Sequence, residues 1–263
     1  MINCVTTMNK DYYDVIGKIM IKTWCKYFPS DSKIYLYLED FSLDFNDSRF
    51  VLMDWQKEIS PLLDQWKTHW ESFRENKSRS LKFTKKAFSQ ISAWNHIKHG
   101  KFLWLDADIV FLNSFDEKIF DKTIEHYPLA SWGNGKFESG TVFINLDHNE
   151  WPKIKKTYED IYSGKIKFPK GENLNTERFY PGNKRLIFPN GWLDGEILGY
   201  SCVSSDVEYK NLNYLCKNNR SNTPLNDSPL GTLMHHLKAK GKFKIKEALT
   251  RLKREDLLIF LNN

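Results

Sequence analysis

The chain has 263 residues, which is enough for one large α/β domain or two small ones. Hydrophobic residues make up 41% of the sequence, so a sizeable core can form. The net charge of +6 fits an anionic ligand such as a nucleoside diphosphate. No zinc-finger or RNA-recognition motif accompanies that charge, so we do not expect a nucleic-acid partner.

The cysteine pattern and the N-terminal residues indicate the compartment. Cys4, Cys25, Cys202 and Cys216 follow neither a zinc-binding nor a CxxC spacing, which favours reduced thiols. The chain begins without a basic-then-apolar signal segment, and no apolar run approaches the length of a transmembrane helix. We therefore expect a cytoplasmic protein without a transmembrane segment.

The first part of the chain predicts a β-α-β-β unit. Residues 2–7, 33–38 and 50–53 are predicted strands. Apolar residues recur at helical spacing over 11–28, and Pro29 ends that pattern. This order favours a parallel sheet with crossover helices.

Small polar residues stand at the end of the first predicted strand. Thr6 and Thr7 can contact the base or ribose of a nucleotide there. They can equally belong to the cap of the helix that follows. The residues themselves leave both interpretations open.

Two helical segments precede the centre of the chain. Residues 58–75 are Trp-rich and amphipathic, and 83–98 predict a clearer helix. The start of the second segment is basic and includes Lys86, whose charge can meet a phosphate. A solvated helix face is the alternative for any single lysine of this group.

Two carboxylates interrupt the most apolar stretch of the sequence. Residues 102–105 and 109–112 are apolar, and Asp106 and Asp108 lie between them. Such a run predicts a strand buried on both faces, with the aspartates where a central strand ends. Ligands of open α/β sheets bind at that edge, and paired carboxylates suit Mg²⁺ or Mn²⁺. The alternative is a hairpin turn capped by aspartate.

The chain after this stretch continues with alternating elements. We expect a short helix at 115–120, a strand at 129–132 and a helix at 151–163. Glu138 and Gly140 form a polar turn that opens onto an apolar strand.

The last hundred residues begin with a candidate lid. Residues 164–185 are rich in Gly and Pro and predict a mobile loop. Asp194 and Glu196 are predicted to lie in a Gly-rich turn, a second candidate for chemistry. Residues 201–229 are predicted to be irregular, and 246–261 to form a final amphipathic helix.

These pieces, in this order, resemble the GT-A-type glycosyltransferases, including glycogenin-like enzymes and bacterial and phage relatives. The resemblance rests on Leu-Trp-Leu-Asp-Ala-Asp at 103–108, Lys-Phe-Thr-Lys-Lys-Ala at 82–87, Glu-Ser-Gly at 138–140, Trp-Leu-Asp at 192–194 and His-Leu-Lys at 236–238. It implies an α/β GT-A fold with a Rossmann-like, mostly parallel central sheet flanked by helices. One domain, 1–263, would comprise a nucleotide-binding half (1–112), an acceptor-side half (113–245) and a C-terminal helix (246–263).

The resemblance also implies a set of ligands. Asp106, Asp108 and a late histidine would hold Mn²⁺ or Mg²⁺, with His236 preferred over His235 because Leu-Lys follows it. The same resemblance places Lys238 at the diphosphate of a UDP- or GDP-sugar. Asp106, Lys86, Thr6 and Thr7 complete the expected donor site. The chain departs from the family pattern after Lys238, where Ala239 replaces the usual glycine.

The reaction implied is transfer of a sugar from a nucleotide sugar to an acceptor. A carboxylate near the anomeric carbon assists an oxocarbenium-like transition state, and Asp194 is the first candidate for it. Glu138 and Glu196 are the reserves. The resemblance favours retention of anomeric configuration. A nucleotidyltransferase and an inactive nucleotide-sugar-binding protein are the competing interpretations, and the acceptor stays open.

Overall fold

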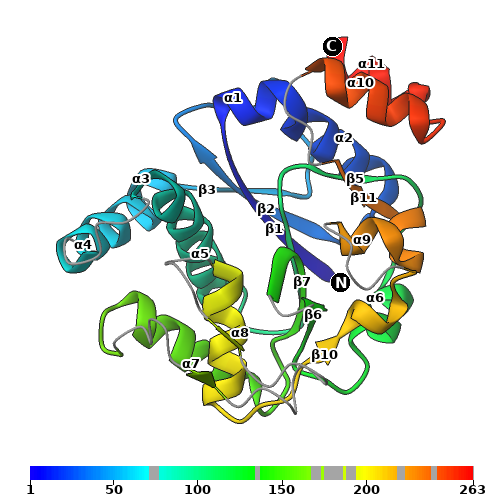
Figure 1. Cartoon of the computed structure of the whole chain (residues 1–263). Helices are drawn as coiled ribbons and strands as arrows, with labels where there is room; N and C mark the ends of the chain where they lie inside the picture. The colour runs from blue at the N-terminus through cyan, green and yellow to red at the C-terminus, as the bar shows by residue number, and fades with distance from the viewer. Residues whose placement is uncertain are drawn as a thin grey trace.

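A mixed α/β architecture surrounds one central sheet in the computed structural model of the chain (Figure 1). The structure describes residues 1–70, 77–133, 137–166, 173–174, 186–187, 194–217, 223–237 and 242–262. The sheet contains β1 (Ile2–Asn9), β2 (Lys33–Glu39), β3 (Phe50–Met53), β4 (Lys101–Leu105), β6 (Leu129–Gly133), β7 (Phe137–Asn145) and β10 (Lys210–Asn211). Smaller strand pairs are β5 (Ile109–Phe111) with β11 (Met234–His236), and β8 (Asn173–Leu174) with β9 (Leu186–Ile187).

The seven strands follow the order β10-β6-β7-β4-β1-β2-β3. All neighbours pair in parallel except β7, which is antiparallel to β4 and to β6. The chain builds β1, β2 and β3 outward in one direction, and β4 then pairs with the other side of β1. The sheet is thus mostly parallel, as predicted, and has a switch point between β1 and β4.

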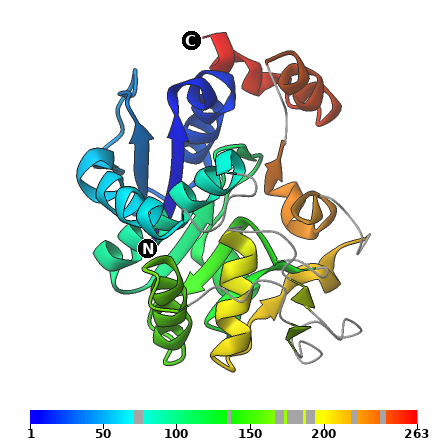
Figure 2. The ribbon, with the colours of Figure 1, turned by 60° about the vertical axis from the view of Figure 1, so that its left-hand side comes forward.

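Helices cover both faces of the sheet (Figures 1 and 2). The α-helices are α1 (Lys10–Tyr12), α2 (Lys18–Tyr27), α3 (Trp55–Glu58), α4 (Ser60–Trp70), α5 (Lys77–Ile97), α6 (Glu117–Ile124), α7 (Trp151–Tyr162), α8 (Asp194–Ser204), α9 (Pro224–Asp227), α10 (Lys242–Arg251) and α11 (Ile259–Asn262). Short 3₁₀ turns span Leu212–Leu215, Pro229–Thr232 and Glu255–Leu258.

Strand β4 separates two hydrophobic cores. Phe102 and Trp104 pack with residues of α3, α4, α5, α7 and α8 on one face. Leu103 and Leu105 pack with residues of α2, α6 and α9 on the other. Because successive side chains of a strand point to opposite faces, four consecutive apolar residues are what this position requires. The predicted doubly buried strand is confirmed.

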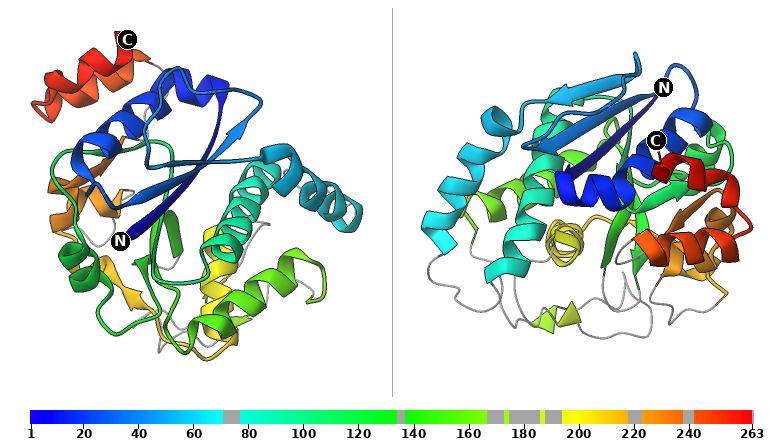
Figure 3. Two further views of the ribbon diagram at one scale, coloured as in Figure 1. Left: turned by 180° about the vertical axis from the view of Figure 1, so that it is seen from behind. Right: turned by 90° about the horizontal axis from the view of Figure 1, so that it is seen from above.

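Two predicted helices are interrupted. The helix predicted over 11–28 contains a π-helical turn at Tyr13–Gly17, where a Cβ on Gly17 would lie 2.5 Å from the sulfur of Met8. The final helix ends at Arg251, because Lys253 adopts a left-handed φ of 54°. The chain then folds back, and α11 packs against α2 (Figure 3).

The stretch around Asp194 also differs from the prediction. Asp194 and Glu196 lie in the first turn of α8 and are buried, where the sequence predicted a Gly-rich turn. Residues 201–204 continue that helix, and 210–211 join the sheet as β10, so this part of the irregular stretch is regular. This stretch is helical because α8 packs against α7 and β7, which buries its apolar residues. The predicted lid at 164–185 lies mostly outside the described residues.

The close contact of α8 and β7 yields a prediction about stability. A Cβ on Gly195 would lie 2.4 Å from the backbone oxygen of Phe137, so Gly195→Ala must displace the helix or the strand. We expect a loss of roughly 1–3 kcal/mol in the free energy of unfolding, measured by urea denaturation. Ser204→Ala, an exposed position at the end of the same helix, is the control and should change it by less than about 0.5 kcal/mol. Equal midpoints for the two variants would contradict the packing described.

Candidate active site

The aspartate pair lies at the carboxyl end of β4, beside the switch point of the sheet. The backbone N–H of Asp106 donates to the carbonyl of Gly140 at 2.7 Å, which continues the β4–β7 ladder by one residue. The chain then turns and enters β5. Asp106 and Asp108 therefore stand where the crevice of an open α/β sheet is found, as predicted.

Asp106, Asp108 and His236 form the cluster with metal-ligand chemistry in the described part of the chain. One ligand atom from each of the three lies within 4.8 Å of the others. The antiparallel pairing of β5 with β11 places His236 opposite Ile109, next to Asp108 in the chain. His236, not His235, belongs to this cluster, and its Nε2 lies 3.0 Å from a carboxylate oxygen of Asp108.

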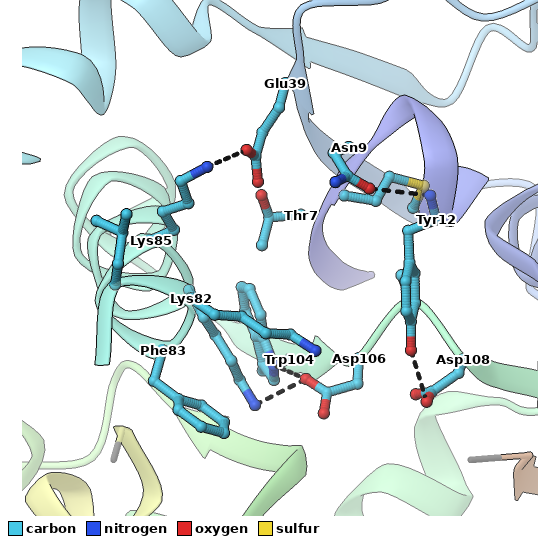
Figure 4. A pocket seen from close by; sticks show the side chains of 14 residues that line it. Thr7, Asn9, Tyr12, Glu39, Lys82, Phe83, Lys85, Trp104, Asp106 and Asp108 are labelled. Carbon is cyan, nitrogen blue, oxygen red and sulfur yellow. Dashed lines mark hydrogen bonds and ion pairs between the residues drawn. The ribbon is translucent and has the colours of Figure 1, made fainter. Parts of the chain in front are cut away.

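The backbone of His236 and the carboxylate of Asp108 are both held by neighbours. Asn226 accepts a hydrogen bond from the His236 N–H at 2.7 Å and donates one to its carbonyl at 2.9 Å. The Tyr12 hydroxyl donates to the second carboxylate oxygen of Asp108 at 2.8 Å (Figure 4). Burial opposes ionisation of Asp108, but the bonds from His236 and Tyr12 outweigh it and lower its pKa.

Lys86 is the cation at the centre of the site. Its ammonium lies 2.7 Å from Asp106 and 3.0 Å from Asp194, and it donates to the carbonyl of Ser139 at 2.7 Å. Burial disfavours the charge, but the two carboxylates more than compensate and raise the pKa of Lys86. Lys86 is therefore a buried, charged connection between α5, β4, β7 and α8.

Asp194, one of the two carboxylates that contact this ammonium, is buried. Its side chain is 1% exposed, and burial raises its pKa despite the opposing effect of Lys86. The structure thus brings Asp194 to the predicted cluster but not to the cavity surface. A general base must reach the acceptor hydroxyl, and in this conformation Asp194 is covered.

Glu138 reaches the same space as the metal-ligand cluster. A Cβ placed on Gly140 would lie 3.0 Å from a Glu138 carboxylate oxygen, 3.1 Å from the ring of His236 and 3.3 Å from a carboxylate oxygen of Asp106. These three side chains therefore surround the small volume that the absent side chain of Gly140 leaves open. A glycine is needed at position 140 because a side chain there would crowd these three groups.

A cavity of about 440 Å³ lies next to the metal-ligand cluster, and Lys86 is one of the residues that line it. Figure 4 shows Asp106 and Asp108 at one end of it, and Glu39 with Lys85 at the other. Its lining residues are Thr7, Met8, Asn9, Tyr12, Glu39, Leu81, Lys82, Phe83, Lys85, Lys86, Trp104, Asp106, Ala107 and Asp108. The cavity is large enough for part of a nucleotide and combines aromatic surface with charges of both signs.

The predicted donor-site residues have different outcomes. Thr7 lines the cavity, and its hydroxyl donates to the carbonyl of Tyr37 at 3.0 Å. Thr6 is fully buried and does not line it. Lys238 and Trp192 lie outside the described residues.

Tyr12 and Glu39 belong to the site but were not among the residues predicted from the sequence. Tyr12 was assigned to the apolar face of a helix, and its spacing in the sequence carries no sign of a contact with Asp108. Glu39 has a detectable signal, because it directly follows the predicted strand at 33–38 and is the last residue of β2.

Comparison with known proteins identifies the architecture. No family model matches the sequence, and neither does any curated protein. Solved structures do match. A structure of the galactosyltransferase LgtC in complex with donor and acceptor sugar analogs superposes with a TM-score of 0.54 at 14% identity, covering 99% of this chain and 95% of LgtC. The chain has the GT-A fold.

Two further structures support this assignment of the GT-A fold. An active-site mutant of LgtC matches with a TM-score of 0.50 and 13% identity, over 95% of this chain and 96% of that one. The glycosyltransferase GlyE of Streptococcus pneumoniae matches with a TM-score of 0.50 and 15% identity. That alignment covers 99% of this chain but 62% of GlyE. At these identities the likeness concerns the fold.

No helix in the described ranges is long and apolar enough to cross a bilayer.

Removal of the central cation should destabilise the protein. Lys86→Met leaves Asp194 buried without its counter-charge, so we expect a loss of roughly 3 kcal/mol in the free energy of unfolding. Adding Asp194→Asn to that variant removes the buried charge and should recover part of the loss. Denaturant unfolding of the two single variants and the double variant gives the coupling. Additive effects would show that the ion pair does not exist in solution.

Filling the space beside Gly140 should act on metal affinity. Gly140→Ala places a methyl group against Glu138, His236 and Asp106, so these side chains must move by tenths of an ångström. We expect the affinity for Mn²⁺ alone to fall by roughly tenfold, measured by the electron paramagnetic resonance of free Mn²⁺. An unchanged affinity, with an unchanged fold by circular dichroism, would mean that Mn²⁺ does not bind in this space.

Proposed function

We propose that this protein is a metal-dependent glycosyltransferase that moves a sugar from a nucleotide-sugar donor to an acceptor. The observation that carries the proposal is the cluster of Asp106, Asp108 and His236 beside the switch point of a GT-A fold. The LgtC structure that the chain resembles holds donor and acceptor sugar analogs, which supports a donor site at the same edge of the sheet.

The residues of the cluster fit a divalent metal ion. Two carboxylates and one imidazole offer the oxygen and nitrogen donors that suit Mn²⁺, and Mg²⁺ accepts the same carboxylates together with phosphate oxygens. The Tyr12 hydroxyl bonds one oxygen of Asp108 and orients this carboxylate as a ligand. When bound, the ion would offset the negative charge that develops on the departing diphosphate.

The protein's own residues add two functions on the donor side. Lys86 is charged and fixed by Asp106, Asp194 and Ser139, so its positive charge acts on a diphosphate through space, without needing to reorganise. The cavity next to it offers room for the nucleoside, with Thr7 and the ring of Tyr12 on its wall. Lys238 as a further diphosphate ligand, and Thr6 as a donor contact, stay predictions from sequence.

The sugar and the acceptor are proposed to lie on the side of Glu138. Its carboxylate borders the volume next to Asp106 and His236, so it is the better placed of the two candidate catalytic carboxylates. The buried carboxylate of Asp194 forms an ion pair with Lys86, which supports a positioning role for Asp194. Retention of configuration is our inference from the family resemblance, and proton NMR of the anomeric centre of the product tests it.

The first experiment measures thermal unfolding against a panel of nucleotides and nucleotide sugars, with and without Mn²⁺. A ligand at a hundred times its dissociation constant adds about 2.7 kcal/mol of stability. We expect one nucleoside diphosphate and its sugars to raise the midpoint in Mn²⁺ only. Asp108→Asn should abolish this shift. Asp64→Asn, which removes an exposed carboxylate on α4, is the control and should keep it.

The product of turnover separates the competing functions. Mn²⁺-dependent release of nucleoside diphosphate and free sugar from a nucleotide sugar supports a transferase, because water replaces the acceptor. Release of pyrophosphate from a nucleoside triphosphate would instead indicate nucleotidyl transfer. Binding of the donor without metal and without turnover would indicate a binding protein.

A further inference from the structure

An ion pair closes the end of the cavity that lies away from the metal-ligand cluster. Glu39 is the last residue of β2, Lys85 belongs to α5, and their side chains form an ion pair. The two side chains are 16% and 30% exposed, so both remain accessible from the cavity. Figure 4 shows them opposite Asp106 and Asp108, with Thr7 beside Glu39.

The Glu39 carboxylate has capacity for a ligand. Lys85 binds one of its oxygens, and no side chain or backbone group in the described ranges donates to the other. The neighbouring Thr7 donates its only hydroxyl proton to Tyr37, so its oxygen is left as an acceptor. This end of the cavity therefore presents acceptors, together with the single ammonium of Lys85.

Both partners of the ion pair are held in place by the fold. Glu39 pairs with Asn9 in the β1–β2 ladder, and Asp40 directly after it adopts a left-handed φ of 59°, which turns the chain away from the cavity. The ammonium of Lys85 lies 5.6 Å from the centre of the Trp55 ring, a cation–π distance. A carboxylate held in this way is preorganised for recognition.

We propose that Glu39 is the specificity-determining residue for the nucleoside of the donor. This inference rests on the proposed function. If the diphosphate lies beside Asp106, at the metal-ligand end of the cavity, the nucleoside extends through the cavity toward Glu39. The carboxylate accepts hydrogen bonds from two adjacent donors on the nucleoside. Lys85 either keeps its bond to Glu39 or donates instead to a carbonyl oxygen of the base.

Two parts of a nucleoside carry such an adjacent donor pair. One is the 2′,3′-diol of ribose, which an acidic residue at the end of the second strand contacts in dinucleotide-binding folds. The other is the guanine edge, with N1–H and the 2-amino group side by side and O6 next to them for Lys85. Uracil offers one N–H between two carbonyls and matches less well.

The test is a binding series in Mn²⁺ on the wild-type protein and on Glu39→Gln. The probes are GDP, IDP, UDP and 2′-deoxy-GDP, because IDP lacks only the 2-amino group and deoxy-GDP only one hydroxyl. We expect Glu39→Gln to weaken the preferred nucleotide by about tenfold and to remove a preference present in the wild type. Loss of the GDP-over-IDP ratio assigns the contact to the base, and loss of the ribo-over-deoxy ratio assigns it to the ribose.

The control is Glu255→Gln, an exposed carboxylate near the C-terminus, which should leave all affinities unchanged. Because the Glu39–Lys85 pair is partly exposed, Glu39→Gln should also keep the unfolding midpoint. The inference is overturned if Glu39→Gln binds like the wild type, or binds every probe more weakly with the same ratios. A wild-type protein that binds no nucleotide overturns the proposed function itself, which is a different result.

Discussion

The site depends on one buried ammonium group. Lys86 comes from α5, and its partners Asp106, Ser139 and Asp194 come from the end of β4, from β7 and from the start of α8. A charge at this depth is tolerated only when its partners surround it, so the four elements are held in one relative arrangement. Lys86 and Asp106 both line the cavity, and Asp106 also borders the space around Glu138.

The second constraint is the short β5–β11 ladder. It joins segments more than a hundred residues apart and fixes His236 against Asp108. Asn226 then holds the backbone of His236, and Tyr12 holds the carboxylate of Asp108, each from a different element. Metal-ligand geometry needs this kind of support, because a ligand that can rotate binds its ion weakly. The C-terminal helices contribute from behind, since Leu249 and Leu257 pack with Val110 in a third hydrophobic cluster.

The parallel arrangement of β1, β2 and β4 brings the functional side chains together. Thr7, Glu39 and Asp106 each stand at or near the carboxyl end of one of these strands, and all three line the same cavity. In such a sheet, residues distant in sequence meet at one edge. This explains how the Glu39 end and the Asp106–Asp108 end can share one cavity.

Much of the fold was predictable from sequence, because the signals are local. The apolar runs at 102–105 and 109–112 indicate strands that are buried on both faces. The strands at 33–38 and 50–53 are likewise predicted by the local pattern of residue types. The aspartate pair was found for the same reason, since two charges inside an apolar run mark a strand end. The π-helical turn at Tyr13–Gly17 and the break after Arg251 were not found, because packing partners decide them.

The sequence by itself determined the α/β class, the strand that ends in Asp106, and the residue types available for a metal ion. The tertiary structure decided which of them meet: it placed His236, which the family resemblance already favoured, next to Asp108, it buried Asp194 beside Lys86, and it brought Thr7 but not Thr6 to the cavity. It also brought in Tyr12 and Glu39. The physical reason is that the spacing of apolar residues along the chain predicts which of them are buried. Contacts between distant residues depend instead on strand register and on the packing of whole elements.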